Sequence, residues 1–357
     1  MQEKRKKVLI CPLNWGLGHA ARCIPLINAL LLGGAEVIIA SSGRPAELLK
    51  SEFPELEHLH FPGFEVTYSR KGFSFLKMMM DLPGMLTAVS KEHRLLDEIA
   101  KKADADLVIS DNRYGCYTSH CKSVFLTHQV NLQLPRFLSL FHSVANNIAE
   151  LYIKRYDECF IADTALHQLA GDLSVVKNDK AKYNYTGPLS RFNSSTSFET
   201  ESFEVLVLLS GPEPQRTVLE NKLLEALQGI KKKVLFIRGL PGESEKLSNY
   251  DDIHFENHLS SKHLNFHLLK SNYIICRSGY SSIMDLAVTG RSAIIIPTPG
   301  QTEQEYLAAY HHKLKHHIAI TQDQLNLAVT FEKLHNCKPL KLQSYIGKVA
   351  IEILSGV

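Results

Sequence analysis

Residues 14–19 read Asn-Trp-Gly-Leu-Gly-His, and residues 276–282 read Cys-Arg-Ser-Gly-Tyr-Ser-Ser. At both places an apolar, strand-like run enters a turn of small residues that opens an amphipathic helix. Such a turn frees backbone N–H groups and directs the positive end of a helix dipole at one point, which favours a phosphate or a developing anion. Two such turns, far apart in the chain, predict two nucleotide-fold halves that face one cleft.

The bulk composition is that of a folded protein with two domains. With 357 residues, the chain is long enough for two domains of ordinary size. Its 45% hydrophobic and 22% charged residues are typical of a globular protein and not of a disordered one. The formal net charge of +3 is close to balance, so nucleic acid is not expected as a partner.

The seven cysteines favour a reducing compartment. Their number is odd, no Cys-x-x-Cys pair occurs and several lie in apolar runs, so we expect reduced thiols in a cytoplasmic protein without disulfides or a zinc site. The basic start leads directly into a strand, so no signal peptide is expected. The longest apolar stretch, Ile24–Ala40, contains Asn28, two glycines and Glu36 and is not expected to span a membrane.

Two segments leave a peripheral contact with the inner face of a membrane open as an interpretation. The basic residues 4–7 precede the first strand, where a solvated tail is the favoured interpretation. Residues 73–86 contain Phe-Ser-Phe-Leu-Lys-Met-Met-Met followed by further apolar residues. This Met-rich segment is expected either to join the core or to form a membrane-facing lid near a lipid-linked acceptor.

Short β-rich runs alternate with helical patterns along the whole chain. The expected strands are Val8–Cys11, Val37–Ala40, Leu107–Ser110, Val124–Leu126, Val205–Leu209, Val234–Arg238, Tyr273–Cys276 and Ala293–Pro297. The helix Ala20–Leu32 separates the first two strands, and the leucines at 219, 223, 224 and 227 share one face of another helix. This alternation predicts an α/β protein built from two doubly wound, Rossmann-like domains.

The domain boundaries follow from composition. Residues 192–201 are polar, rich in Ser and Thr and without periodicity, which is typical of a linker. We therefore expect an N-terminal domain over 1–186, a linker over 187–203 and a C-terminal domain over 204–335. A C-terminal helix over 336–357 is expected to pack back on the N-terminal domain. Ligands of such domains bind at the carboxyl ends of the strands.

His19 is the candidate general base of the first turn. Gly16-x-Gly18-x-x-Ala21 satisfies a loose dinucleotide fingerprint, but the second strand ends without the acidic residue that NAD needs, and only NADP stays open, through Arg44. A helix N-terminus lowers the pKa of a histidine and favours the neutral form that a base needs. The alternative, a histidine that only bonds the backbone, is less favoured. Asp111 either orients His19 in a His–Asp dyad or forms an Asx turn.

The second turn is the candidate diphosphate site. Ser278, Gly279, Tyr280, Ser281 and Ser282 offer backbone N–H groups and hydroxyls to phosphate, and Asp285 offers a carboxylate to ribose. Ser282-x-x-Asp285 also matches a capping box, and both interpretations hold together. Gly290 is expected to end this helix. The loop Thr298–Glu305 carries amide and carboxylate side chains that suit the hydroxyl groups of a sugar.

The residues of the second turn and the segment after it resemble a known family. Arg277-Ser278-Gly279, Asp285, Gly290, Pro297 and Gln304-Glu305-Tyr306 are similar in kind and spacing to the C-terminal signature of glycosyltransferase family 28, with MurG-like UDP-N-acetylglucosamine transferases nearest in kind. The turn Gly16–His19 resembles the Gly-Gly-His turn of that family. His128-x-x-Asn131 resembles its His-Glu-Gln-Asn segment, and Gly187-x3-Arg191 resembles its Gly-Asn-Pro-Val-Arg segment.

The resemblance implies a GT-B fold, with the donor nucleotide bound by the C-terminal domain and the acceptor by the N-terminal one. Asp285 would contact ribose, although the family has Glu there, and Arg191 would reach the phosphates. Gln304 and Glu305 would hold the donor sugar, and Glu305 replaces a family Gln. Leu259 would pair with uracil through its backbone. Gly16, Gly18, His128 and Asn131 would lie on the acceptor side of the cleft.

The implied reaction is an inverting transfer of a sugar from a UDP-sugar, with UDP-N-acetylglucosamine as the leading donor. His19 would remove the proton of the acceptor hydroxyl, and the helix dipole with Arg277 or Arg191 would stabilise departing UDP without a metal ion. No cofactor is expected besides the UDP-sugar co-substrate. The acceptor is unidentified, and a lipid-linked molecule is one candidate.

Three alternatives stay open beside the transferase. A UDP-sugar epimerase shares the two-domain architecture, an NADP oxidoreductase suits the loose fingerprint, and a binding-only homologue lacks activity. The histidines at 311, 312, 316 and 317 have a spacing that suits a metal, but without Glu or Cys nearby we expect them on a solvated helix face.

Overall fold

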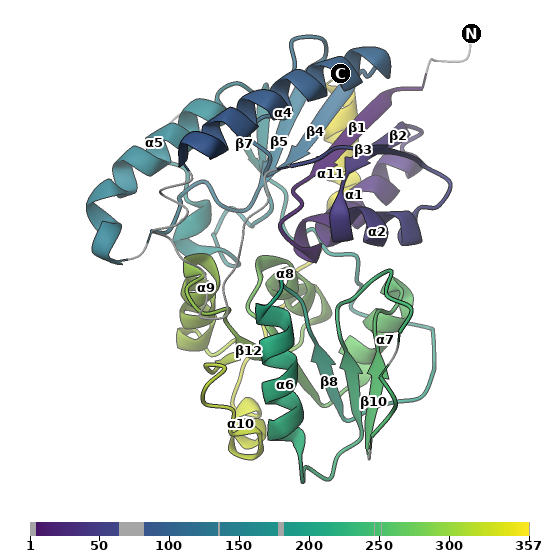
Figure 1. Ribbon diagram of the computed structural model, residues 1–357, viewed down its shortest axis with the longest axis vertical. Coiled ribbons are helices and arrows are strands. Elements are labelled where there is room, and N and C mark those ends of the chain that lie inside the picture. Colours follow the sequence, from purple (N-terminus) through teal and green to yellow (C-terminus); the bar gives the residue numbers. More distant parts are fainter. Residues whose placement is uncertain are drawn as a thin grey trace. The chain divides into compact units, whose positions relative to one another are not determined.

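The computed structural model describes residues 5–63, 82–134, 136–177, 182–245, 247–250 and 252–356. The chain forms two compact units, each with its own parallel sheet (Figure 1). The N-terminal unit comprises the described residues of Met1–Val66 and Phe75–Leu189, together with the end of the chain from Ser344. The C-terminal unit comprises essentially the described residues of Ser190–Gln343.

The sheet of the N-terminal unit has the order β3-β2-β1-β4-β5-β6-β7 and is parallel throughout. Its strands are β1 (Lys7–Pro12), β2 (Glu36–Ser41), β3 (Glu57–His60), β4 (Leu107–Asp111), β5 (Lys122–Thr127), β6 (Glu158–Ile161) and β7 (Tyr183–Tyr185). The central strands are apolar and almost fully buried, as parallel strands covered on both faces must be.

Helices cover both faces of this sheet. They are α1 (Leu17–Leu32), α2 (Gly43–Glu52), α4 (Leu82–Lys102) and α5 (His142–Ile153), with the short 3-10 helices η1 (Arg136–Phe141) and η2 (Gly171–Ser174). Leu96 and Ala100 of α4 pack against Leu9 of β1 and Ile38 of β2. Near the other edge of the sheet, Ile153 at the end of α5 packs with the buried residues of β5 and β6.

The C-terminal unit repeats the same plan with the strand order β10-β9-β8-β11-β12-β13. Its strands are β8 (Val205–Leu208), β9 (Val234–Ile237), β10 (Ile253–Glu256), β11 (Tyr273–Arg277), β12 (Ile294–Ile296) and β13 (Ile318–Ala319). Its helices are α6 (Gln215–Leu227), α7 (Ser261–Lys270), α8 (Tyr280–Thr289), α9 (Thr302–Lys313) and α10 (Leu327–Leu334). Its core joins the sheet to Leu219, Leu223 and Leu227 of α6 and to Phe331 of α10.

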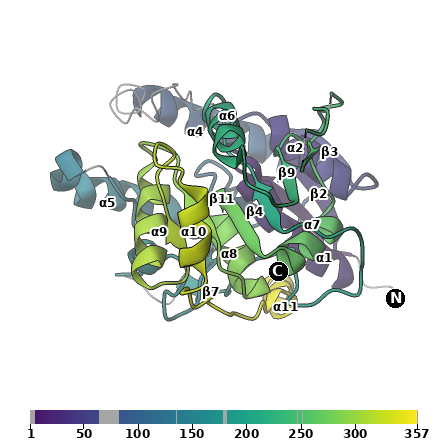
Figure 2. The same ribbon diagram turned by 90° about the horizontal axis from the view of Figure 1, so that it is seen from below.

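The last helix, α11 (Ile346–Ser355), belongs to the N-terminal unit. It lies beside α1, as both views show (Figures 1 and 2). Val349, Ala350 and Ile353 are buried, and the contact with α1 is close enough that a Cβ added at Gly33 would lie 2.9 Å from Cδ1 of Leu354. The chain therefore returns to its first domain at its end.

All eight strands expected from the sequence are present, with small differences at their ends. Within the described ranges, five further strands were not predicted: β3, β6, β7, β10 and β13. Four of these, β3, β7, β10 and β13, form the edges of the two sheets, where a strand has a neighbour on one side only. At an edge a short, partly polar sequence such as Glu57–His60 is sufficient. Because such sequences have no continuous apolar run, they lack the signal of the buried strands.

The expectations about membranes have different outcomes. In the described part of the chain, no helix has the length and apolar character needed to span a bilayer. Residues 73–81 of the Met-rich segment fall outside the described residues, and α4 begins within the segment at Leu82. Of the basic start, Lys4 also falls outside the described residues.

Candidate functional site

The polar residues of the N-terminal unit gather where β1, β4 and β5 end. These three strands are neighbours in the sheet, and the strand order changes direction between β1 and β4. His19 follows β1, Asp111 is the last residue of β4, and His128 comes directly after β5. In a doubly wound sheet this change of direction is where ligands bind, because the loops on its two sides diverge and leave a crevice.

The start of α1 positions His19. The N-cap residue of this helix is Gly16, whose φ of 122° is disfavoured for any residue with a side chain. The helix then begins at Leu17, so His19 lies in its first turn and Arg22 one turn later. Residues three apart share a helix face, and both side chains point at the end of β4. The imidazole of His19 retains 16% exposure.

Arg22 is the centre of this cluster, and its side chain is 1% exposed. Its Nε donates to Oδ1 and Oδ2 of Asp111 at 2.8 and 2.9 Å, and its Nη2 also contacts Oδ1. Its Nη2 lies 2.8 Å from Nδ1 of His19, and its Nη1 lies 2.7 Å from Nδ1 of His128. One guanidinium thus binds a carboxylate and two imidazoles.

Burial and charge act on this cluster in opposite directions. Burial works to raise the pKa of Asp111, but the charges and hydrogen bonds of Arg22 and His19 outweigh it and lower the pKa to about 2. Burial and the charge of Arg22 lower the pKa of His19, although Asp111 acts to raise it. At neutral pH the cluster therefore holds an ionised Asp111 and a neutral His19.

The His–Asp dyad expected from the sequence is only partly present. Nδ1 of His19 lies 3.3 Å from Oδ2 of Asp111, so the two residues do meet. The carboxylate of Asp111, however, is bound first by Arg22, which was not predicted. Asp111 is also not an Asx turn residue, because it is fully buried at the end of β4 and its side chain faces α1.

The predicted pair of His128 and Asn131 separates. His128 is buried and joins the cluster through Arg22. The side-chain nitrogen of Asn131 instead donates to the carbonyl oxygens of Asp172 and Val175 at 2.8 and 2.6 Å. Asn131 therefore fixes the loop around η2, and its amide nitrogen is occupied there.

A cavity of about 420 Å³ opens beside the same turn. Its apolar lining includes Leu13 and Trp15 after β1 and Val89 on α4. Its polar side includes Glu92 and Arg113, which form an ion pair at 2.6 Å. The guanidinium of Arg113 also lies over the ring of Phe61, 4.0 Å from its centroid. The cavity has the size and lining expected for a small organic group.

In the C-terminal unit, Arg277 at the end of β11 faces inward. Its side chain is 1% exposed, and it donates to the carbonyl oxygens of Pro297 and Gln215 at 3.0 and 2.9 Å and to Oε1 of Gln322 at 3.2 Å. Burial lowers the pKa of Arg277 to about 10. The expectation that Arg277 binds phosphate is therefore not supported in this conformation, where it holds three loops together instead.

Ser278 and Gln304 connect the two loops of the expected donor site. The hydroxyl of Ser278 donates to the carbonyl oxygen of Gln304 at 2.9 Å, and Oε1 of Gln304 accepts from the N–H of Thr298 at 2.9 Å. Glu305 accepts from the N–H of Gly300 at 2.8 Å. The first contact holds the segment 298–305 against the turn after β11, and the other two fix the conformation of the segment itself.

The helix α8 starts earlier than the capping-box expectation required. Its N-cap is Gly279 and its first residue is Tyr280, so Ser282 lies inside the first turn and caps nothing. The N-cap residue Gly279 provides no side-chain cap, and the positive end of the helix dipole lies at this turn. Gly290 ends the helix in a left-handed conformation with φ of 64°, as expected.

Asp285 lies one turn into α8 and accepts from the hydroxyl of Ser190 at 2.6 Å. Burial raises the pKa of Asp285 to about 6, although the charge of Arg191 and the bond from Ser190 act to lower it. Arg191 donates to Ser261 at the start of α7 at 3.3 Å. Leu259, in the loop after β10, is half-buried. Asp285 and Arg191 thus lie close together within one unit.

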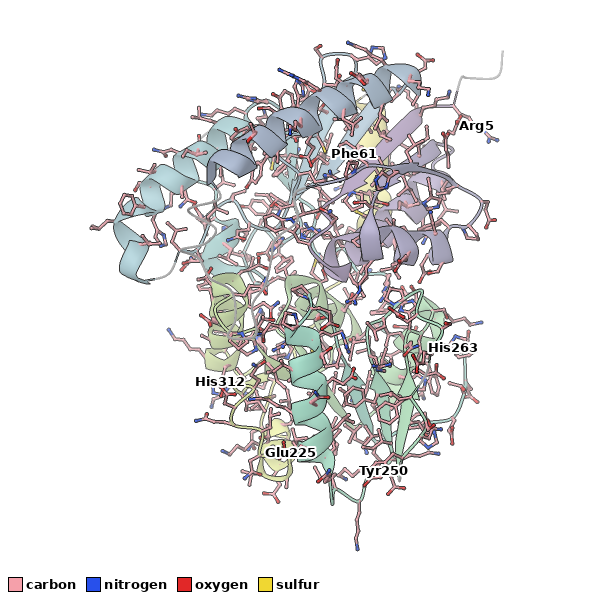
Figure 3. All side chains as sticks on the ribbon, in the orientation of Figure 1. Arg5, Phe61, Glu225, Tyr250, His263 and His312 are labelled. Carbon is pink, nitrogen blue, oxygen red and sulfur yellow. The ribbon has the colours of Figure 1, made fainter. Side chains whose placement is uncertain are left out.

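The histidine group does not form the solvated face that we expected. His311 and His317 are buried, and Nδ1 of His311 lies 3.0 Å from Nδ1 of His316. Only His312 is exposed (Figure 3). Burial and the neighbouring histidines lower the pKa of His317 well below its usual value. Among the described residues, no group of three or more His, Cys, Asp or Glu side chains is arranged to hold a metal ion.

Two residues of these sites were missed in the sequence. The position of Arg22 could have been predicted, because it lies three residues after His19 on a predicted helix and therefore on the same face. Ser190 carries none, because its partner Asp285 is 95 residues away. Contacts across such separations depend on how the loops of the domain meet.

Comparisons with known proteins agree with this architecture. Residues 214–345 match the family model of the Glycosyltransferase family 28 C-terminal domain. An uncharacterised glycosyltransferase of Methanosarcina acetivorans is 24% identical over 324 residues, which cover 85% of this chain and 82% of the relative.

Two solved structures are similar over nearly their whole length. The structure of Arabidopsis thaliana UGT89C1 with UDP has a TM-score of 0.60 and 15% identity, covering 98% of this chain and 95% of that one. The structure of Acinetobacter baumannii MurG has a TM-score of 0.56 and 10% identity, covering 99% and 100%. The structural matches confirm the GT-B fold. The family match confirms the resemblance over residues 214–345, and together with the relative it supports the transferase assignment.

Proposed function

We propose that this chain, a GT-B glycosyltransferase with a family 28 C-terminal domain, moves a sugar from a UDP-sugar to the hydroxyl group of an acceptor with an apolar part. The observation that carries the proposal is the buried cluster around His19. It places a neutral imidazole with some exposure at the ligand-binding edge of the N-terminal sheet. UDP-N-acetylglucosamine is the leading donor because of the MurG-like signature of residues 277–306.

The proposed step is an inverting displacement at the anomeric carbon of the donor. The acceptor oxygen forms a bond to that carbon while the bond from the carbon to the UDP oxygen breaks and its electron pair leaves with UDP. His19 takes the proton of the acceptor hydroxyl at Nε2. Among the described residues, none forms a hydrogen bond with this nitrogen, so it is open to a substrate.

The donor is proposed to bind the turn after β11. The start of α8 would receive the diphosphate, and the dipole of this helix with Arg191 would stabilise departing UDP without a metal ion. Asp285 would accept from the ribose hydroxyls. Oγ1 of Thr298 and Oε1 of Gln301 are buried in this structure without a hydrogen-bond partner among the described residues, which suits a loop that receives a polar sugar.

The acceptor is proposed to place its apolar part in the 420 Å³ cavity. This cavity adjoins the turn that carries His19, and Trp15 lines it. A lipid-linked acceptor has the required chemistry. Because Trp15 is the only tryptophan of the chain, an apolar ligand in the cavity should change the fluorescence of the protein. A membrane contact of the Met-rich segment is a separate proposal, tested by co-sedimentation with anionic vesicles.

The decisive experiment measures UDP release and sugar transfer from UDP-N-acetylglucosamine across a panel of aryl and prenyl alcohols. His19→Ala should abolish transfer while UDP still raises the melting temperature. His120→Ala, at an exposed histidine of the same unit, is the matched control and should stay active. Equal loss of transfer and UDP binding in His19→Ala would mean a structural role. Full activity with excess chelator is expected, and loss of activity would contradict the metal-free mechanism.

The comparisons favour this transferase over the epimerase and the NADP oxidoreductase. The same assays separate them, since an epimerase would isomerise the donor sugar without any acceptor. An oxidoreductase would show a rise in melting temperature with NADPH and none with UDP.

A further inference from the structure

The contacts of Arg22 decide where the proton of His19 resides. A guanidinium has five N–H donors and no acceptor, and it stays charged at all relevant pH values. Its contacts of 2.8 Å with Nδ1 of His19 and 2.7 Å with Nδ1 of His128 are therefore hydrogen bonds only if both nitrogens carry lone pairs. A neutral histidine with a lone pair on Nδ1 carries its proton on Nε2.

Asp111 competes for the same nitrogen of His19. Its Oδ2 lies 3.3 Å from Nδ1, and a carboxylate bonds this nitrogen only when the nitrogen carries the proton. Nδ1 cannot accept from Arg22 and donate to Asp111 at once. The shorter contact is with Arg22, so the resting arrangement is the one in which Nδ1 accepts.

We propose that Arg22 is a positioning residue that selects the tautomer of His19. In the ligand-free enzyme it holds His19 with the proton on Nε2, where the ring is a donor and not a base. The base form carries the proton on Nδ1, directed at Asp111, and leaves the lone pair on Nε2. It forms when Nδ1 changes its partner from Arg22 to Asp111. The inference rests on the proposed role of His19 as the base.

The surroundings of His19 contain few other charged groups. Arg22 and the thiol of Cys23 face the cluster from α1, Asp111 from β4 and His128 from the end of β5. Burial and Arg22 lower the pKa of His19, and Asp111 raises it. Removal of Arg22 should therefore change two properties of His19 together, because it releases Nδ1 to Asp111 and raises the pKa.

The test measures the tautomers directly, by long-range 1H–15N correlation NMR on the full-length protein with 15N-labelled histidine. Two histidines provide internal references. Nε2 of His58 donates to the carbonyl oxygen of Phe53 at 2.9 Å, and Nδ1 of His93 donates to that of Tyr117 at 2.9 Å. The signals of His19 are identified by their loss in His19→Gln. The wild-type His19 should match the pattern of His58, and the pattern of His93 would overturn the proposal.

The variants separate charge from geometry. In Arg22→Met, His19 should change to the pattern of His93, and the acid limb of the pH profile of kcat/KM should move to higher pH. Arg22→Lys keeps the charge but lacks the planar fork, so the acid limb should stay near its wild-type position while the tautomer is no longer fixed. An unchanged tautomer in Arg22→Met would refute the proposal. If Arg22→Met does not fold, the wild-type measurement alone decides the proposal, because a proton on Nδ1 of His19 in the wild type would overturn it.

These results are distinguishable from failure of the proposed function, because the NMR measurement needs no substrate. A fully active His19→Ala would remove the catalytic role of His19 but leave its tautomer as measured. Conversely, His19→Ala could be inactive while wild-type His19 carries its proton on Nδ1. That result would support His19 as the base and contradict the role proposed for Arg22. The reference His58, which Arg22 does not contact, should keep its pattern in every variant.

Discussion

The ion pair between Arg22 and Asp111 should make the stability of the N-terminal unit depend on pH. Both side chains are buried, and the pKa of Asp111 lies near 2 against an ordinary 3.8. A pKa lowered in the folded state contributes stability above pH 4, and this is lost as the pH falls from about 4 to 2. The difference corresponds to about 2.4 kcal/mol at 1.36 kcal/mol per unit.

Removal of one partner costs more than this, because it leaves the other charge buried and unpaired. Asp111→Asn and Arg22→Met should each lower the free energy of unfolding by about 3–5 kcal/mol. The double variant should lose clearly less than the sum of the two, since no charge then remains unpaired. Lys101→Met is the control, because Lys101 pairs with Asp97 on the surface and should contribute less than about 1 kcal/mol.

The assay is urea unfolding at pH 7 and pH 3, followed by the fluorescence of Trp15. As the only tryptophan, it reports on the N-terminal unit and not on the other one. The wild type should lose stability between the two pH values, and the double variant should lose less. The reasoning would be refuted if the two single variants each cost under 1 kcal/mol and added to the cost of the double variant.

Three further outcomes are expected. Asp285→Asn should raise the stability of the protein at pH 8 by up to about 3 kcal/mol and leave it nearly unchanged at pH 4. The reason is that a carboxyl whose pKa is raised from 3.8 to about 6 on folding costs stability as the pH rises from about 4 to 6, and Asn does not ionise. Melting temperatures at both pH values check this. Gly239→Ala should destabilise by about 2 kcal/mol or more, since φ is 69° and the new Cβ would lie 2.3 Å from the carbonyl oxygen of Leu209; a melting temperature equal to wild type would contradict this. In Gly16→Ala the new Cβ has open space, but the φ of 122° is disfavoured for alanine. This variant should lower the free energy of unfolding by about 1–2 kcal/mol and slow transfer by displacing His19. Urea unfolding and transfer kinetics measure the two effects.

The fold was predictable because its signals are local. Continuous apolar runs such as Val8–Cys11 and Val205–Leu209 can only be buried parallel strands when helical patterns separate them. Glycines at 16 and 290 have conformations that a side chain disfavours, and both were expected at helix ends. The edge strands lacked such a signal. An edge strand pairs with a neighbour on one side only, so its sequence need not be continuously apolar.

The sites were predictable in part. His19 and His128 were expected where ligands bind, because parallel strands carry their carboxyl ends to one edge of a sheet. The direction of a side chain was not predictable in the same way. Arg277 ends a central strand too, but it turns inward and donates to the carbonyl oxygens of Pro297 and Gln215. Nothing in its own sequence distinguishes the two outcomes.

The position of α11 limits how this protein can be divided for experiments. The helix that carries His19 is supported by the last ten residues before Gly356, so a fragment cut after the first domain would expose the apolar face that α1 presents to them. A purification tag or fusion partner at the carboxyl terminus would be attached directly to that support. An N-terminal tag, or a single-chain fragment that joins residue 189 to residue 344 through a short linker, keeps the first domain complete.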